Sequence, residues 1–168
     1  MNGGGVHGIA AAWVLASGAC TAGASAQTMR PTLDYASAGT IRETCLAWAG
    51  QRGKPVAIAV FDARGMLVTY AHQDGVSTAV GEVARWKGES SAKFGRATAD
   101  IAQLSPPANM PAVATIRGGV PIYAADGTLL GGVGTSGMSS EDDAACGAAG
   151  IAAAGLRTSR AAISPKPQ

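Results

Sequence analysis

His72 is the residue whose type most directly indicates metal chemistry. It is the only histidine that remains once an expected N-terminal leader containing His7 is removed. A neutral imidazole is a common ligand of transition-metal ions, and the thioether of Met110 or Met138 could supply a second ligand. A solvent-exposed histidine at the end of a strand would give the same pattern. The sequence leaves both interpretations open.

Three cations could hold the carboxylate groups of a bound molecule. Arg85, Lys87 and Arg117 carry the fixed positive charge that forms charge-assisted hydrogen bonds with carboxylates. Solvated surface charge is the alternative for each of them. Their use in binding therefore depends on what the fold places beside them.

The stretch Gly118–Gly137 is the expected framework for such a site. It contains two apolar runs, 120–123 and 129–133, joined by an Ala-Asp-Gly reversal typical of a β-hairpin. Six glycines, at positions 118, 119, 131, 132, 134 and 137, would leave main chain open to the close approach of something flat or large. We expect a recess between this hairpin and the helix that carries Lys87. Bulges and turns where strands meet helices are the alternative.

Enzyme signatures are not found in the sequence. It has no Ser-His-Asp order, HExxH, CxxC pair or Walker loop. Asp62, Asp74 and Asp126 lie in or beside expected turns, where aspartate bonds to local backbone amides. The segment 134–139 could bind an anion at a helix start, but the acids at 141–143 would repel it. A binding protein is therefore favoured over an enzyme. The main alternative is an enzyme or binder for a small organic acid in the same recess, and a third is an assembly module without a ligand.

Composition limits the class of protein. The chain has 168 residues, 47% hydrophobic and 14% charged, with a formal net charge of +2. This length suits one domain with a real core. The small net charge excludes the basic surface of a nucleic-acid binder.

The N-terminus indicates export. Residues 1–26 read as a secretory signal peptide, with an apolar segment and the small-x-small sequence Ala24-Ser25-Ala26. The apolar segment is shorter than a membrane span requires, and lipidation at Cys20 is a weaker alternative. We expect a secreted, periplasmic protein. In an oxidising compartment Cys45 and Cys146 either form a disulfide or remain as buried thiols.

The mature chain, residues 27–157, is expected to form one domain, followed by a flexible tail at 158–168. The patterns predict a helix over 32–52, a hairpin with strands 56–61 and 66–70, and a long helix over 77–104 weakened by Gly88 and Gly95. A short edge strand at Thr115-Ile116, the glycine-rich hairpin and a helix from Ser139 or Ser140 to Leu156 follow. The predicted class is α+β, with helices packed on an antiparallel sheet built from two hairpins, in the order helix-hairpin-helix-hairpin-helix.

Several blocks occur in a fixed order between Ala38 and Leu156. They are Val60-Phe61-Asp62, Gly65, Leu67-Val68, Gln73-Asp74-Gly75, Lys87, Phe94, Thr98, Gly118-Gly119-Val120-Pro121-Ile122, Asp126-Gly127, Gly134, Ser136-Gly137, Glu141, Asp143 and Ala149-Gly150. In this order and spacing the chain resembles the GlcG/HbpS-like haem-binding proteins, which include the C-terminal domain of PduO-type cobalamin adenosyltransferases. The resemblance covers nearly the whole mature protein.

The resemblance implies a haem-binding α+β domain that forms homo-oligomers, and a role in haem handling or redox sensing for secreted members. With His72 as the metal ligand, the expected cofactor-binding residues at motif positions are Asp74, Lys87, Phe94, Thr98, Gly118, Gly119 and Pro121. Thr98 matches a threonine near the ligand in the family, although a helix threonine also bonds back to its own turn. The sequence differs from the family at 72–76, where His-Gln-Asp-Gly-Val replaces Arg-Met-Asp-Gly-Ala, and at Gly88 and Ala97. It also has no histidine over 33–52, where some relatives bind iron.

Overall fold

A computed structural model describes residues 1–5 and 30–160 of the chain. Over these residues the elements run in the order α1 (Tyr35–Gly50), β1 (Ala57–Asp62), β2 (Leu67–His72), α2 (Thr78–Phe94), α3 (Thr98–Gln103), β3 (Gly119–Tyr123), β4 (Leu129–Ser136) and α4 (Ser140–Ala153). Most of the predicted leader and the tail residues 161–168 lie outside the described residues.

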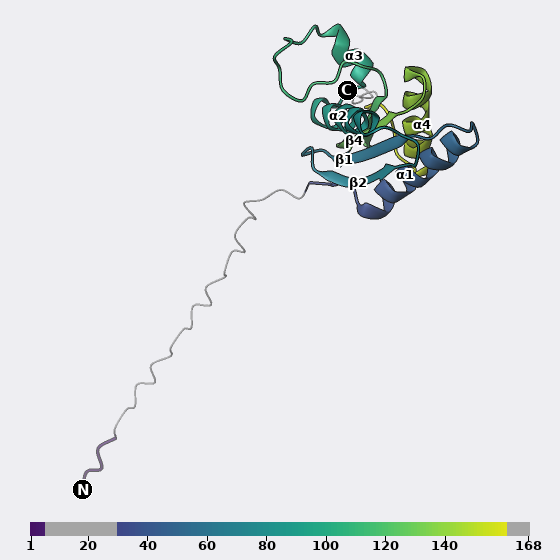
Figure 1. Cartoon of the computed structure of the whole chain (residues 1–168). Coiled ribbons are helices and arrows are strands. Elements are labelled where there is room, and N and C mark those ends of the chain that lie inside the picture. The colour runs from purple at the N-terminus through teal and green to yellow at the C-terminus, as the bar shows by residue number, and fades with distance from the viewer. Residues whose placement is uncertain (6–29, 161–168) are drawn as a thin grey trace, which may run out of the picture.

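The strands form one antiparallel sheet in the order β2-β1-β4-β3 (Figure 1). β1 and β4 occupy its centre and pair with each other, so the two hairpins join side by side. The predicted α+β class and element order are confirmed. In the register, Ala57 of β1 lies between His72 of β2 and Ser136 of β4.

Helices cover both faces of the sheet (Figure 1). On one face α1 and α4 enclose the main core, in which Ile41 and Ile151 meet Ile58 and Val133. On the other face Ala92 of α2 packs with Ala59 and Phe61 of β1 in a smaller cluster. Because both faces are covered, every residue of β1 is buried, as its continuous apolar run predicts.

Local chemistry sets the helix limits. The Asp34 and Ser139 side chains cap α1 and α4 by accepting hydrogen bonds from Ser37 N and Asp142 N. α2 ends where Gly95 adopts a left-handed conformation with φ 58°, which glycine reaches without steric cost. The predicted long helix over 77–104 therefore divides into α2 and the short α3.

The predicted edge strand at Thr115-Ile116 is wrong. Residues 104–118 form an irregular connection whose backbone is bound by side chains. Ser90 Oγ donates to Ala112 O at 2.8 Å and accepts from Ala114 N at 2.6 Å, and Thr98 Oγ1 donates to Ile116 O at 2.6 Å. These side-chain partners replace the hydrogen bonds that a strand ladder would provide.

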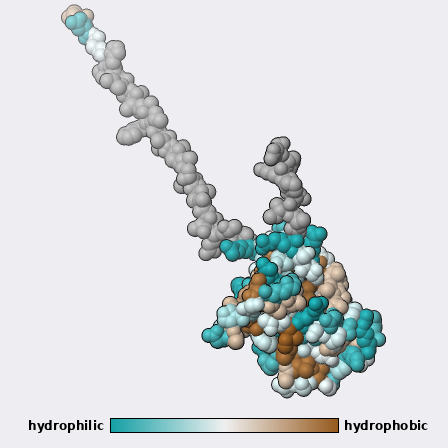
Figure 2. Space-filling model, turned by 90° about the horizontal axis from the view of Figure 1, so that it is seen from above, coloured by the Kyte–Doolittle hydropathy of each residue, from teal (hydrophilic) through white to brown (hydrophobic). Residues whose placement is uncertain are grey.

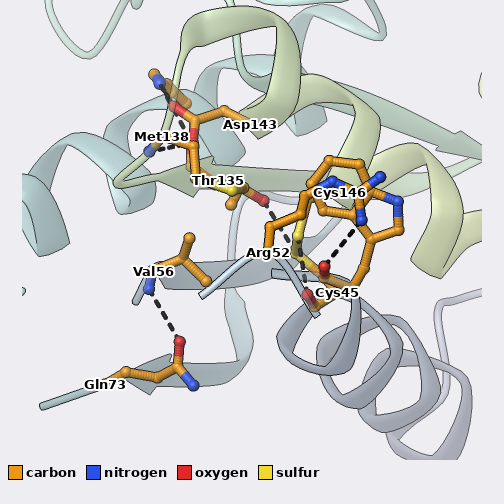
Figure 3. The surroundings of a disulfide bond; sticks show 10 residues. Cys45, Arg52, Val56, Gln73, Thr135, Met138, Asp143 and Cys146 are labelled. Carbon is orange, nitrogen blue, oxygen red and sulfur yellow. Dashed lines mark hydrogen bonds and ion pairs between the residues drawn. A yellow bond between two sulfur atoms is a disulfide. The ribbon is translucent and has the colours of Figure 1, made fainter. Parts of the chain in front are cut away.

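A disulfide joins Cys45 of α1 to Cys146 of α4 (Figure 3). Both residues are fully buried and their Cα atoms are 4.8 Å apart. The bond crosses 101 residues of sequence and therefore links the first and last helices of the domain. Of the two alternatives for this pair, the structure has the disulfide.

The visible surface is mostly hydrophilic, with small hydrophobic patches (Figure 2). Large apolar side chains that remain exposed include Tyr35, Met66 and Leu104. None of the described helices is both long and apolar enough to cross a membrane.

Candidate functional site

The glycine-rich hairpin is covered by α2, which lies directly on its main chain. A Cβ added at Gly134 would come within 3.0 Å of Ala84 O and Gly88 N. One added at Gly119 would lie 2.5 Å from Lys87 O. The neighbours are backbone atoms of the helix, so nothing as large as a ligand fits between the two elements.

The expected recess between the hairpin and the Lys87 part of α2 is therefore wrong, and no organic-acid pocket lies beside Lys87. The hollow that the hairpin does share with α2 lies at the end of the helix, at Phe94. Gly119, Gly132 and Gly134 are the hairpin glycines whose added Cβ would meet the main chain of α2. α2 presents small residues at Ala84, Gly88 and Ala92, which seat the helix on β4, whereas Gly81 packs against Tyr70 and His72 of β2. Of the six hairpin glycines, only Gly137 is exposed.

Lys87 is the largest fully buried side chain of the domain and is engaged inside the fold. Its Nζ donates to Asp143 Oδ2 at 2.9 Å and to Thr135 O at 3.0 Å. The other carboxylate oxygen of Asp143 accepts from Met138 N at 3.1 Å (Figure 3). Burial raises the pKa of Asp143, against the lowering effect of the Lys87 ammonium. The pair ties α2 to β4 and α4, and Lys87 does not reach the surface.

Thr98 is also buried and joins two elements rather than bonding back to its own turn. Its hydroxyl donates to Ile116 O and accepts from Gly119 N at 3.0 Å, which fixes the chain as it enters β3. A Cβ at Gly118 would lie 2.6 Å from Lys87 Nζ. The structure thus brings Lys87, Thr98, Gly118 and Gly119 together, at a buried junction between α2, α3 and β3.

His72 lies elsewhere, exposed at the end of β2. It lines a surface hollow of about 490 Å³ together with Lys54, Pro55, Gln73 and Asp74. Its Nε2 is 3.2 Å from Ser77 O. A carbonyl oxygen only accepts hydrogen bonds, so Nε2 carries the proton in this contact and the Nδ1 lone pair of the neutral ring is left for a ligand. Metal-binding histidines commonly donate their second N–H to a backbone carbonyl in this way.

Gln73 anchors the chain beside this hollow. Its Oε1 accepts from Val56 N at 2.9 Å, which ties the residue after β2 to the residue before β1 (Figure 3). Lys54 was not predicted as a site residue. The hairpin register could have indicated it, because Ala57 pairs with His72 and Lys54 lies three residues before Ala57. One imidazole, one ammonium and one carboxylate therefore share this hollow.

Neither candidate thioether joins His72. Met138 packs against the core under α1 and α4, whereas His72 lies beside Gly81 of α2 on the opposite face of the sheet. Met110 belongs to the connection that follows α3. Over residues 1–5 and 30–160, no group of three or more histidine, cysteine, aspartate or glutamate side chains could hold a metal ion. The hollow offers an incoming metal one histidine ligand.

Phe94 and Pro121, the remaining predicted site residues, meet at the other end of the sheet. They line a hollow of about 450 Å³ with Arg96, Asp100, Leu129 and Arg160. The predicted site residues are therefore divided among three places: the His72 hollow, the buried junction and the Phe94 hollow. Sequence reasoning missed Arg96 and Arg160, the second because it lies in the segment predicted as a flexible tail.

Comparison with protein families identifies the family of this chain. The family described as "Haem degrading protein HbpS-like" matches residues 33–152. This chain belongs to the HbpS-like family. The resemblance inferred from the sequence blocks is confirmed, because the match spans all of them. The comparison with curated proteins finds no match to this HbpS-like chain.

Solved structures share its fold. A double mutant of Streptomyces reticuli HbpS is 25% identical, with a TM-score of 0.71 over 86% of this chain and 97% of that one. A PduOC complex with haem is 24% identical, with a TM-score of 0.70 over 77% of this chain and 100% of that one. The Klebsiella pneumoniae protein ORFY is 18% identical, with a TM-score of 0.72 over 79% of this chain and 97% of that one. At such identities the last two show a common fold only.

Proposed function

We propose that this HbpS-like protein binds haem and takes part in haem handling or redox sensing outside the cytoplasm. The observation that carries the proposal is the family match over residues 33–152, in a family described as haem degrading. The fold shared with S. reticuli HbpS and with PduOC, whose structure is a haem complex, supports it.

The residues of the His72 hollow have the donor chemistry that haem needs. His72 would ligate the iron through Nδ1, with its ring oriented by Ser77 O. The Lys54 ammonium would pair with a propionate, while Asp74 would repel one and so favour a single orientation. When bound, haem supplies a redox-active iron. The protein's part is to hold that iron through one imidazole at an accessible surface.

Export is part of the proposal. The Cys45–Cys146 disulfide supports an oxidising compartment, because such bonds persist in secreted and periplasmic proteins and are rare in the cytosol. The apolar N-terminal segment with its small-x-small sequence points the same way. Mass spectrometry of the periplasmic fraction tests this, and a chain that keeps Met1 and is found in the cytosol would contradict it.

A homo-oligomer is the expected assembly. β2 is an edge strand with exposed Met66 and Leu67 at its start, and exposed apolar edges are sites where chains associate. Light scattering after gel filtration, with and without haem, measures the assembly. A monomeric mass at all concentrations would refute this part of the proposal.

The test of haem binding is a hemin titration followed by absorbance. We expect a saturable Soret shift at a stoichiometric ratio in the wild type, its loss in His72→Ala and weaker binding in Lys54→Gln. Met110→Leu is the matched control and should bind as the wild type does, because this thioether is remote from the hollow. Near-ultraviolet circular dichroism verifies that each variant is folded. Absence of a saturable shift in the wild type overturns the function, and its retention in His72→Ala overturns the ligand assignment.

A further inference from the structure

The hollow around Phe94 has the features of a second binding site, independent of the haem proposal. It lies at the opposite end of the sheet from His72, beside the β3–β4 turn. Its volume of about 450 Å³ falls in the range of small-molecule sites. Phe94, Pro121 and Leu129 contribute apolar surface, and Arg96 and Arg160 contribute positive charge.

Tyr123 fixes two walls of this hollow. Its hydroxyl donates to Gly95 O at 2.5 Å, which holds the turn between α2 and Arg96. Its backbone pairs with Arg157, through N–H···O distances of 2.8 Å and 2.9 Å, which holds the segment that leads to Arg160. The two cationic segments are therefore positioned before any ligand arrives, and this lowers the entropic cost of binding.

Two carbonyl groups that follow the end of α2 already accept hydrogen bonds from side chains of the protein. Gly95 O accepts from Tyr123, and Arg96 O accepts from Ser91 Oγ at 2.7 Å. Among the described residues, neither Arg96 nor Arg160 has a carboxylate within ion-pair distance. Within residues 30–160, both guanidinium groups therefore keep their hydrogen-bond donors for a ligand.

We propose that this hollow binds a small carboxylate with a flat apolar body. The guanidinium groups of Arg96 and Arg160 hold the carboxylate through charge-assisted, fork-shaped hydrogen bonds. Phe94, Pro121 and Leu129 contact the apolar body. Asp100 also lines the hollow, so the three charged side chains sum to one positive charge. That sum matches a single carboxylate better than a phosphate dianion.

Nuclear magnetic resonance titration of the ¹⁵N-labelled protein with benzoate tests the proposal. We expect saturable shifts in the backbone amide signals of residues 94–100, 122–123 and 158–160. The dissociation constant should rise at least tenfold in Arg96→Gln and in Arg160→Gln. Arg85→Gln is the matched control, because this exposed arginine lies on α2 outside the hollow, and it should bind as the wild type does.

Two further probes separate the contributions. Benzyl alcohol keeps the ring without the charge, and inorganic phosphate keeps the charge without the ring; both should bind more weakly than benzoate. The proposal is overturned if benzoate gives no saturable shifts, or if Arg96→Gln and Arg160→Gln both bind it as well as Arg85→Gln does. Equal binding of benzyl alcohol, or tighter binding of phosphate, also overturns the assignment. Hemin binding at His72 is a separate readout, so either proposal can fail alone.

Discussion

Replacement of Gly134 by alanine tests the closest backbone contact of the fold. The new Cβ would lie under 3.0 Å from Ala84 O and Gly88 N. These atoms belong to the helix backbone and cannot rotate away as a flexible side chain would. Ordinary contact begins near 3.4 Å, so α2 would have to retreat from β4 by roughly 1 Å along a close-packed contact.

The expected cost is at the upper end of the range for overpacked sites, about 3 kcal/mol. For a domain of this size, 1 kcal/mol corresponds to roughly 3–4 °C in melting temperature, so Gly134→Ala should melt about 10 °C below the wild type. Gly39→Ala is the matched control. It lies inside α1, where an added Cβ meets nothing within 4 Å. It should stabilise the protein by about 0.5–1 kcal/mol, because alanine loses less backbone entropy than glycine in a helix.

Thermal and urea unfolding, followed by circular dichroism under non-reducing conditions, measure both variants. A Gly134→Ala protein that melts within about 2 °C of the wild type would refute the reasoning, since a single core overpacking should cost 1–3 kcal/mol. Such a result would mean that α2 does not lie in close contact with the main chain of β4. A recess between the two elements, as expected from the sequence, would then be the better description.

Three other perturbations have expected outcomes. Replacing Cys45 and Cys146 together by alanine should cost about 4–5 kcal/mol in urea unfolding, because the bond closes a loop of about 100 residues; a loss below about 1 kcal/mol would contradict this. Lys87→Ala should lower the free energy of unfolding by about 3–5 kcal/mol, because Asp143 stays buried without its partner. Adding Asp143→Ala should restore part of that stability, and no recovery would refute the argument that the two residues form a pair. Burial alone would raise the pKa of Asp62, but hydrogen bonds from its turn lower it below the ordinary 3.8. Its contribution is therefore present above pH 3.8 and lost as the pH falls, so the excess stability of wild type over Asp62→Asn should shrink in acid; a constant difference down to pH 2 would contradict the shift.

The order of the elements could be predicted because its causes are local. Asp34 and Ser139 are side-chain caps that act within one helix turn. Gly127, with φ 84°, lies in the predicted turn of the second hairpin. Gly95 is a predicted weak point of the long helix, but the hydrogen bond that its carbonyl accepts from Tyr123 comes from another element and has no local signal.

The glycines of β4 show where local reasoning failed. A glycine-lined recess and a glycine-lined contact with a helix give the same residue pattern in the strand. The deciding information lay in α2, where Ala84, Gly88 and Ala92 recur at a spacing of four residues. When the small residues of a helix and of a strand face each other, they indicate close packing. To recognise this in the sequence, one must know that α2 covers β4.

The site residues divide for the same reason. Lys87 and Thr98 were indicated by motif positions and His72 by its residue type, yet the first two side chains are buried inside the fold and His72 is exposed. Arg160 looked like part of a flexible tail until a backbone pair at Arg157 placed it beside Arg96.

The sequence by itself determined the class of fold, the family and the residues able to form a disulfide, because short-range periodicity, caps and turn chemistry are written in neighbouring residues. The tertiary structure decided which polar side chains are satisfied inside and which face solvent. That choice depends on contacts between segments far apart in the chain, such as Lys87 with Asp143. Lys87 is buried with two hydrogen-bond partners, whereas Lys54 lies at a surface hollow. Both are lysines in the sequence, and only the packing distinguishes their roles.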